Sequence, residues 1–70
     1  MLVSRKSDIS GKVHVMHIPQ LNREKLDAYL RGEFRGKLIQ NIFPELNADQ
    51  REFILTGITP KEWSELFAEH

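Results

Sequence analysis

The apolar positions in residues 1–18 follow the spacing of two short strands. They fall into two groups, Leu2 and Val3, then Val13, Val15, Met16 and Ile18. The polar stretch SDISGK between the groups contains a glycine and is typical of a turn. Pro19 ends the second group, because proline has no amide hydrogen to donate to a neighbouring strand. We therefore predict a β-hairpin over residues 1–18, and the mixed alternation on its second arm indicates that both faces are partly covered.

Residues 22–32 carry the signals of a first helix. Asn22 is a suitable N-cap, and Leu21 and Leu26 have the spacing of a hydrophobic staple around it. Gly32 is a suitable stop, because glycine readily takes the left-handed conformation that follows many helices. The apolar stripe of this helix consists of Leu26, Tyr29 and Leu30.

Residues 33–43 show a second helical pattern. The apolar residues at helical spacing are Leu38, Ile39, Ile42 and Phe43. Gly36 interrupts the pattern early, and Pro44 ends it. We expect a buried helix over this stretch.

Two further helices are predicted between residues 47 and 68. Asn47 with Gln50 three positions later matches a capping box, with Phe53 and Ile54 as apolar contacts, and Gly57 stands where a left-handed residue ends the helix. The second helix begins with Thr59 as N-cap, Pro60 at the first position and Glu62 closing a second capping box. Its apolar stripe consists of Trp63, Leu66 and Phe67. We expect Trp63 to face the core, where Ile58 would staple it, and Glu62 and Glu65 to face solvent.

The order of these elements indicates an α+β fold, with an N-terminal β-hairpin followed by three to four short helices in residues 22–68. Seventy residues fit a single small domain, residues 1–70. A core of this size gives only a small free energy of unfolding. Self-association as a homo-oligomer would add stability, and we keep it as an alternative to a monomer. The absence of cysteine agrees with a reducing cytoplasm. No signal peptide or long apolar run indicates secretion or a membrane partner.

The net charge of zero conceals two halves of opposite sign. Residues 1–40 contain eight basic and four acidic residues, whereas residues 41–70 contain two basic and six acidic residues. Such a separation of charge steers a charged partner, or a second copy, towards one end of the molecule. The candidate acidic surface consists of Glu45, Asp49, Glu52, Glu62, Glu65 and Glu69. The candidate basic surface, suited to nucleic acid, consists of Arg5, Lys6, Lys12, Arg31, Arg35 and Lys37.

No pattern of reactive residues predicts an enzyme. His14 and His17 are three apart on a predicted strand and so face opposite sides, which argues against a shared metal. Ser7 and Ser10 lie near these histidines in sequence, but nothing resembles a nucleophile elbow. We therefore expect no catalytic residue, no metal and no cofactor.

The stretch REFILTGITPKEWSELF resembles a helix-turn-helix in length. Its second helix is acidic, however, and would be repelled by the phosphates that DNA binding requires. A nucleic-acid role therefore falls to the basic surface, with Tyr29 or Phe34 available to stack on bases. The acidic helix instead suits the basic groove of a nucleic-acid enzyme, with Trp63 or Phe67 as the anchor if either is exposed.

Residues 38–67, LIQNIFPELNADQREFILTGITPKEWSELF, resemble a group of small bacteriophage and prophage proteins that share the pattern LIQxxFPxLxxxxREFxxTGITxxEW. The preceding SGKVHVMHIP is similar to a strand found in those proteins, whereas the basic RGEFRGK insert departs from their pattern. The resemblance implies an accessory protein of an infected bacterium and assigns no catalytic residue.

Together these observations favour a phage accessory protein that binds and modulates or inhibits a bacterial host protein in the cytoplasm through a charged surface. A nucleic-acid-binding regulator that uses the basic half is the first alternative. A minor virion or assembly component is the second.

Overall fold

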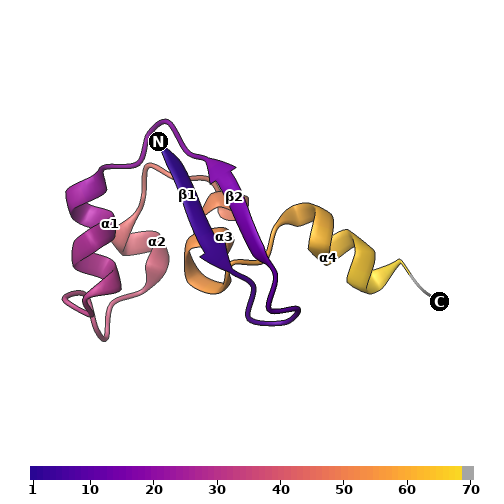
Figure 1. The fold of residues 1–70 in the computed structure, drawn as a ribbon. Helices are drawn as coiled ribbons and strands as arrows, with labels where there is room; N and C mark the ends of the chain where they lie inside the picture. Colours follow the sequence, from indigo (N-terminus) through magenta and orange to yellow (C-terminus); the bar gives the residue numbers. More distant parts are fainter. Residues whose placement is uncertain (69–70) are drawn as a thin grey trace.

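The computed structural model describes residues 1–68, which contain two strands and four helices (Figure 1). In chain order the elements are β1 (Leu2–Lys6), β2 (Val13–His17), α1 (Arg23–Leu30), α2 (Ile39–Ile42), α3 (Ala48–Thr56) and α4 (Pro60–Phe67). The expected α+β class, a β-hairpin followed by short helices, is confirmed. None of the helices within residues 1–68 has the length and apolar character needed to cross a lipid bilayer.

The two strands pair in antiparallel register, with Val3 opposite Met16 and Arg5 opposite His14. Side chains alternate between the faces of a strand, so these four residues share one face, on which Val3 is buried. The other face carries three exposed apolar side chains, Leu2, Val13 and Val15. The expectation that both faces are partly covered is therefore wrong for this outer face.

One hydrophobic cluster joins the hairpin to α1, α2 and α3. Its largest fully buried side chains are Phe43, Phe53, Ile18 and Ile54. Tyr29 packs edge to face on Phe43, with the ring centroids 5.6 Å apart. In Figure 1, α1 and α2 lie on one side of the hairpin, while α4 extends away on the other side. The core therefore fixes the first three helices and leaves α4 at the margin of the molecule.

The caps predicted for α1 and α3 are confirmed. Asn22 Oδ1 accepts a hydrogen bond from the Lys25 amide at 3.1 Å. Asn47 Oδ1 accepts from the Gln50 amide at 2.8 Å, and the Gln50 side chain accepts from the Asn47 amide at 3.0 Å, which completes the capping box. Gly57 then ends α3 in the left-handed conformation, with φ of 76°. Each helix end thereby gains partners for backbone groups that the helix itself cannot satisfy.

The helix expected over residues 33–43 is wrong in its first part, because only α2 is helical there. Residues 31–38 form a series of turns, which we name the 31–38 loop. Gly32 and Gly36 have φ values of 84° and 88°. A right-handed helix needs negative φ throughout, so the left-handed backbone at Gly36 interrupts the expected helix, whereas Gly32 follows α1 as predicted. Leu38, which we expected inside, is 60% exposed.

Candidate functional site

A cluster of hydrogen-bonded polar side chains surrounds the carboxylate of Glu62 at the start of α4. Thr59 Oγ1 accepts from the Glu62 amide at 3.1 Å and so caps the helix as predicted. The Glu62 side chain, however, does not return to Thr59 to close a capping box. It points to the hairpin and is only 8% exposed. The expectation that Glu62 faces solvent is therefore wrong.

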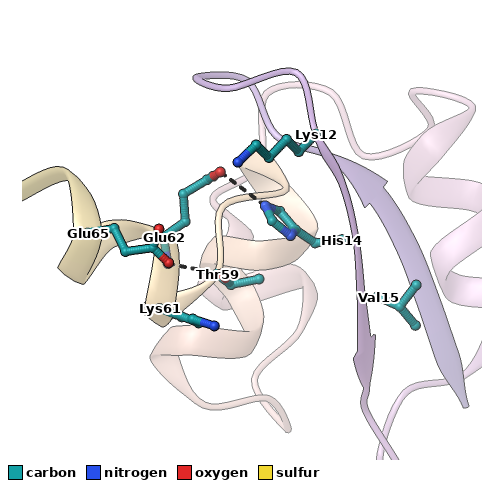
Figure 2. A pocket seen from close by; sticks show the side chains of 7 residues that line it. All are labelled: Lys12, His14, Val15, Thr59, Lys61, Glu62 and Glu65. Carbon is teal, nitrogen blue, oxygen red and sulfur yellow. Dashed lines mark hydrogen bonds and ion pairs between the residues drawn. The ribbon is translucent and has the colours of Figure 1, made fainter.

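Three hairpin side chains bind this one carboxylate. Ser7 Oγ donates to Glu62 Oε1 at 2.5 Å, and Ser10 Oγ donates to Glu62 Oε2 at 2.5 Å. His14 Nε2 lies 3.0 Å from Oε2. Figure 2 shows His14 and Glu62 pointing towards each other from β2 and α4, and both line a depression of about 430 Å³. We name Ser7, Ser10, His14 and Glu62 the Glu62 cluster.

Ser7 also organises the turn that presents these groups. Its hydroxyl oxygen accepts from the amides of Ile9 at 3.2 Å and Ser10 at 3.3 Å. Its own amide donates to the carbonyl of Lys12 at 2.8 Å, and its carbonyl accepts from the Gly11 amide at 3.0 Å. Ser7 is buried. The turn between β1 and β2 is therefore held in one shape, with its hydroxyls directed at α4.

These hydrogen bonds lower the pKa of Glu62 from 4.5 to about 2. The largest contribution comes from Ser10, followed by Ser7 and His14, because each hydrogen bond stabilises the charged carboxylate. Burial acts in the opposite direction and raises the pKa, but the hydrogen bonds outweigh it. Glu62 is therefore ionised at any pH near neutrality.

The geometry differs from that of a nucleophile with its base. In a catalytic triad the serine hydroxyl donates to the imidazole, and the carboxylate binds the far side of the ring. Here both hydroxyls donate directly to Glu62, and no hydrogen bond within residues 1–68 joins Ser7 or Ser10 to His14. The direct effect of the cluster is to join α4 to the hairpin.

A second face of α4 is apolar and exposed. Trp63 and Phe67 stack with centroids 5.4 Å apart and ring planes 5° from parallel. Phe67 is 63% exposed, Leu66 is exposed and Trp63 is partly exposed. We name these three residues the α4 face. The expectation that Trp63 faces the core is wrong, because the side of α4 that approaches the hairpin carries Glu62 instead.

Besides Glu62, two of the predicted acidic positions bind neighbours within the chain. Glu45 Oε1 lies 3.4 Å from Lys25 Nζ, and both side chains are about one-third exposed. Glu52 accepts from Thr56 Oγ1 at 3.0 Å within α3. A partner that bound these carboxylates would have to compete with contacts already made. They are therefore weaker candidates for a binding surface than the sequence alone suggested.

The remaining acidic positions are spread over the molecule. Asp49 is exposed in the first turn of α3, where a negative charge stabilises the helix. Glu65 is exposed on α4, beside the depression that also holds Glu62. Glu69 lies outside the described residues. Of the six predicted acidic positions, then, only Asp49 and Glu65 lie within residues 1–68 as exposed carboxylates with no hydrogen bond or ion pair to another described residue.

The predicted basic positions divide into two groups. Arg5, Arg35 and Lys37 line one groove of about 450 Å³ beside α1 and the 31–38 loop. Tyr29 and Phe34, the two aromatic residues proposed for stacking, line the same groove. Sequence reasoning therefore identified five of its residues without showing that they meet.

The other basic positions lie elsewhere. Arg31 binds Glu33 through Nε at 2.6 Å, and both side chains are more than half exposed. Lys6 is exposed at the end of β1, and Lys12 lines the depression beside the Glu62 cluster. Leu30, which we expected on the buried stripe of α1, is exposed and lines the groove.

The sequence pattern did not predict that the serines of the hairpin would meet Glu62. Ser7 and Ser10 are separated from Glu62 by 55 and 52 positions. The only local signal was that several hydroxyls lie in the same hairpin as His14. Among residues 1–68, no group of three or more histidine, aspartate or glutamate side chains is placed to hold a metal ion.

Comparison with known proteins identifies no relative of this chain. No family model matches the chain, and neither the curated proteins nor the solved structures contain a significant match.

Proposed function

We propose that this chain is a non-enzymatic accessory protein of the bacteriophage type, which binds a bacterial host protein in the cytoplasm through the α4 face. The observation that carries the proposal is the stacked pair of the partly exposed Trp63 and the exposed Phe67, on a helix that extends away from the rest of the fold (Figure 1). Exposed aromatic residues on one helix face are the side chains that most often dominate the energy of protein–protein binding.

The attachment of α4 suits this role. The Glu62 cluster holds the helix against the hairpin, so the α4 face is presented in a defined orientation before any partner arrives. Because Trp63 and Phe67 already stack on each other, they lose little further freedom on binding. An amphipathic helix of this kind binds by placing its apolar side in a groove of the partner.

The exposed acidic residues indicate which class of host protein would bind. Glu65 is exposed on α4, and Asp49 is exposed on α3. Exposed carboxylates speed association with a basic surface, although they add little to affinity. A nucleic-acid enzyme, whose groove is basic, is the host protein that agrees best with this arrangement.

The other parts of the proposal have separate support. The phage origin is supported by the sequence pattern over residues 38–67. A role in binding is supported by the Glu62 cluster, where the carboxylate takes both serine hydroxyls that a nucleophilic mechanism would need free. The role of a minor virion or assembly component stays a prediction.

The test begins with affinity capture from bacterial lysate, followed by binding measurements with the captured protein in purified form. Phe67→Ser and Trp63→Ser are each expected to weaken binding by roughly thirtyfold or more, the loss typical of an anchor residue. Leu38→Ser is the matched control, because Leu38 is 60% exposed but lies far from α4 in the chain. Unchanged binding by both α4 variants, or equal weakening by the control, would show that α4 is not the binding surface.

A further inference from the structure

The groove beside α1 and the 31–38 loop carries three cations and no acid. Arg5 reaches it from the inner face of β1, and Arg35 and Lys37 reach it from the loop. Among residues 1–68, no aspartate or glutamate lines the groove. The nearest acid in sequence, Glu33, is occupied by its ion pair outside the groove. The groove therefore attracts an anion and repels a metal cation.

Arg5 supplies a more specific signal. Its Nε is buried and has no hydrogen-bond partner within residues 1–68. A buried guanidinium N–H without an acceptor is rare, because burial removes the water that would otherwise accept from it. The planar guanidinium donates two parallel hydrogen bonds to a phosphate or carboxylate. Arg5 lines the groove, so its guanidinium group is a candidate partner for an anion bound there.

Two aromatic rings flank the cations. Tyr29 is held in place by its edge-to-face contact with Phe43. Phe34 is partly buried, and the Lys37 ammonium lies 6.0 Å from the centre of its ring. Both residues line the groove, and nucleic-acid bases stack on aromatic side chains whatever the base. This combination of rings and cations distinguishes the groove from a site for a simple anion.

The backbone of the loop leaves room for a ligand. At Gly36, an added β-carbon would meet no atom within 4 Å, so the chain there borders open space. The groove volume, about 450 Å³, lies within the range of small-molecule sites in proteins. A single nucleotide is therefore an occupant of suitable size.

We propose that this groove binds a nucleotide unit, with its phosphate on Arg5, Arg35 and Lys37 and its base on Phe34 or Tyr29. A free nucleotide and a single strand of nucleic acid offer the same chemistry. The proposal is independent of the α4 face, because the groove lies beside α1, on the other side of the hairpin from α4 (Figure 1).

The experiment is a titration of the purified protein, observed by NMR, with three probes. They are inorganic phosphate, adenosine monophosphate and an oligothymidylate of about ten nucleotides. We expect the oligothymidylate, the monophosphate or both to shift the resonances of the 31–38 loop at concentrations where phosphate alone does not. A response to the monophosphate identifies a free nucleotide as sufficient, whereas a response to the oligothymidylate alone identifies a strand.

Variants then test the residues. Phe34→Ala is expected to weaken binding by roughly ten- to a hundredfold through the loss of stacking. Arg35→Ala and Lys37→Ala are each expected to weaken oligothymidylate binding and to reduce its salt dependence by about one unit of slope. Both residues are exposed, so we expect these two variants to keep the fold. The test therefore remains valid even if a substitution at Arg5 unfolds the protein.

Lys12→Ala and Lys61→Ala are the matched controls, because each removes one cation from the depression beside α4. The proposal requires that they bind as the unaltered protein does. It is overturned if neither nucleotide probe binds, if inorganic phosphate binds as tightly as both, or if the controls lose as much affinity as the groove variants. These measurements use no host protein, so their outcome is separate from that of the α4 test.

Discussion

Gly57 approaches Lys6 so closely that a β-carbon at Gly57 would lie 2.3 Å from the Lys6 carbonyl oxygen. Beside this contact, the Asp8 amide donates to the Thr56 carbonyl at 2.9 Å, which joins the end of α3 to the end of β1. Gly57 also has φ of 76°. Glycine is therefore required here for two reasons, its left-handed backbone and its lack of a side chain.

We predict that Gly57→Ala lowers the free energy of unfolding by more than the roughly 1–2 kcal/mol that a left-handed alanine costs by itself. The excess arises because the Lys6 backbone must move to admit the methyl group. Gly11→Ala is the matched control, since Gly11 has the same φ of 76° but its nearest neighbour would be Lys6 Cε at 3.8 Å. Urea denaturation measures the free energy of unfolding of both variants. Equal losses for Gly57→Ala and Gly11→Ala would contradict the close contact between Gly57 and Lys6.

The Glu62 cluster predicts a dependence of stability on pH. The pKa of Glu62 is about 2 in the folded chain, against an ordinary 4.5. A lowered pKa means that the folded state favours the ionised form, so its stabilisation is complete above pH 4.5 and disappears as the pH falls towards 2. We therefore expect the thermal midpoint of the unaltered protein to exceed that of Glu62→Gln at neutral pH, and the difference to shrink through this range.

Glu65→Gln provides the comparison on the same helix. Glu65 is exposed, so its replacement is expected to change the thermal midpoint little at any pH in this series. Fluorescence of Trp63, the single tryptophan, follows α4 in the same samples. A difference between the unaltered protein and Glu62→Gln that stayed constant down to pH 2 would argue against the ionised cluster.

Two phenylalanines are expected to differ sharply in their effect on stability. Phe53 is fully buried, and Phe53→Ala should cost about 3–5 kcal/mol through lost packing and the cavity that remains. Phe67 is 63% exposed on α4, and Phe67→Ala should change stability by no more than about 0.5 kcal/mol. Chemical denaturation compares them. A comparable cost at Phe67 would mean that the α4 face is covered in solution.

The cap of α3 is expected to contribute measurably. Asn47→Ala removes the acceptor for the Gln50 amide and should cost about 1 kcal/mol. Asn22→Ala removes the corresponding single bond at α1. Because Asn47 takes part in a complete capping box, its loss should equal or exceed that at Asn22. Urea denaturation of the two variants measures which loses more free energy of unfolding. A smaller loss for Asn47→Ala than for Asn22→Ala would argue against a stabilising capping box at α3.

Local signals in the sequence were sufficient for the helix ends. Asn22, Asn47, Thr59 and Gly57 act through backbone groups within three or four residues, so their roles follow from spacing alone. Over residues 33–43 the same reasoning failed. The apolar spacing predicted one helix, but Gly36 adopts a left-handed backbone that outweighs it.

The Glu62 cluster and the groove are formed by residues that lie far apart in the sequence. The spacing of residues along the chain does not show such contacts. The position of Glu62 three residues after Thr59 predicted a local capping box, whereas its actual partners, Ser7 and Ser10, lie more than fifty positions away. Likewise, the amphipathic pattern of α4 indicated that one side differs from the other without indicating which side meets the core. Arg5 joins Tyr29 and Phe34 only because β1 lies beside α1 and the 31–38 loop.

The hairpin stands between α4 on one side and α1 with the 31–38 loop on the other (Figure 1). A large molecule seated at one end consequently leaves the opposite end accessible. Occupancy of the groove and occupancy of the α4 face would therefore not exclude each other, and one short chain would be able to hold two unlike molecules at the same time.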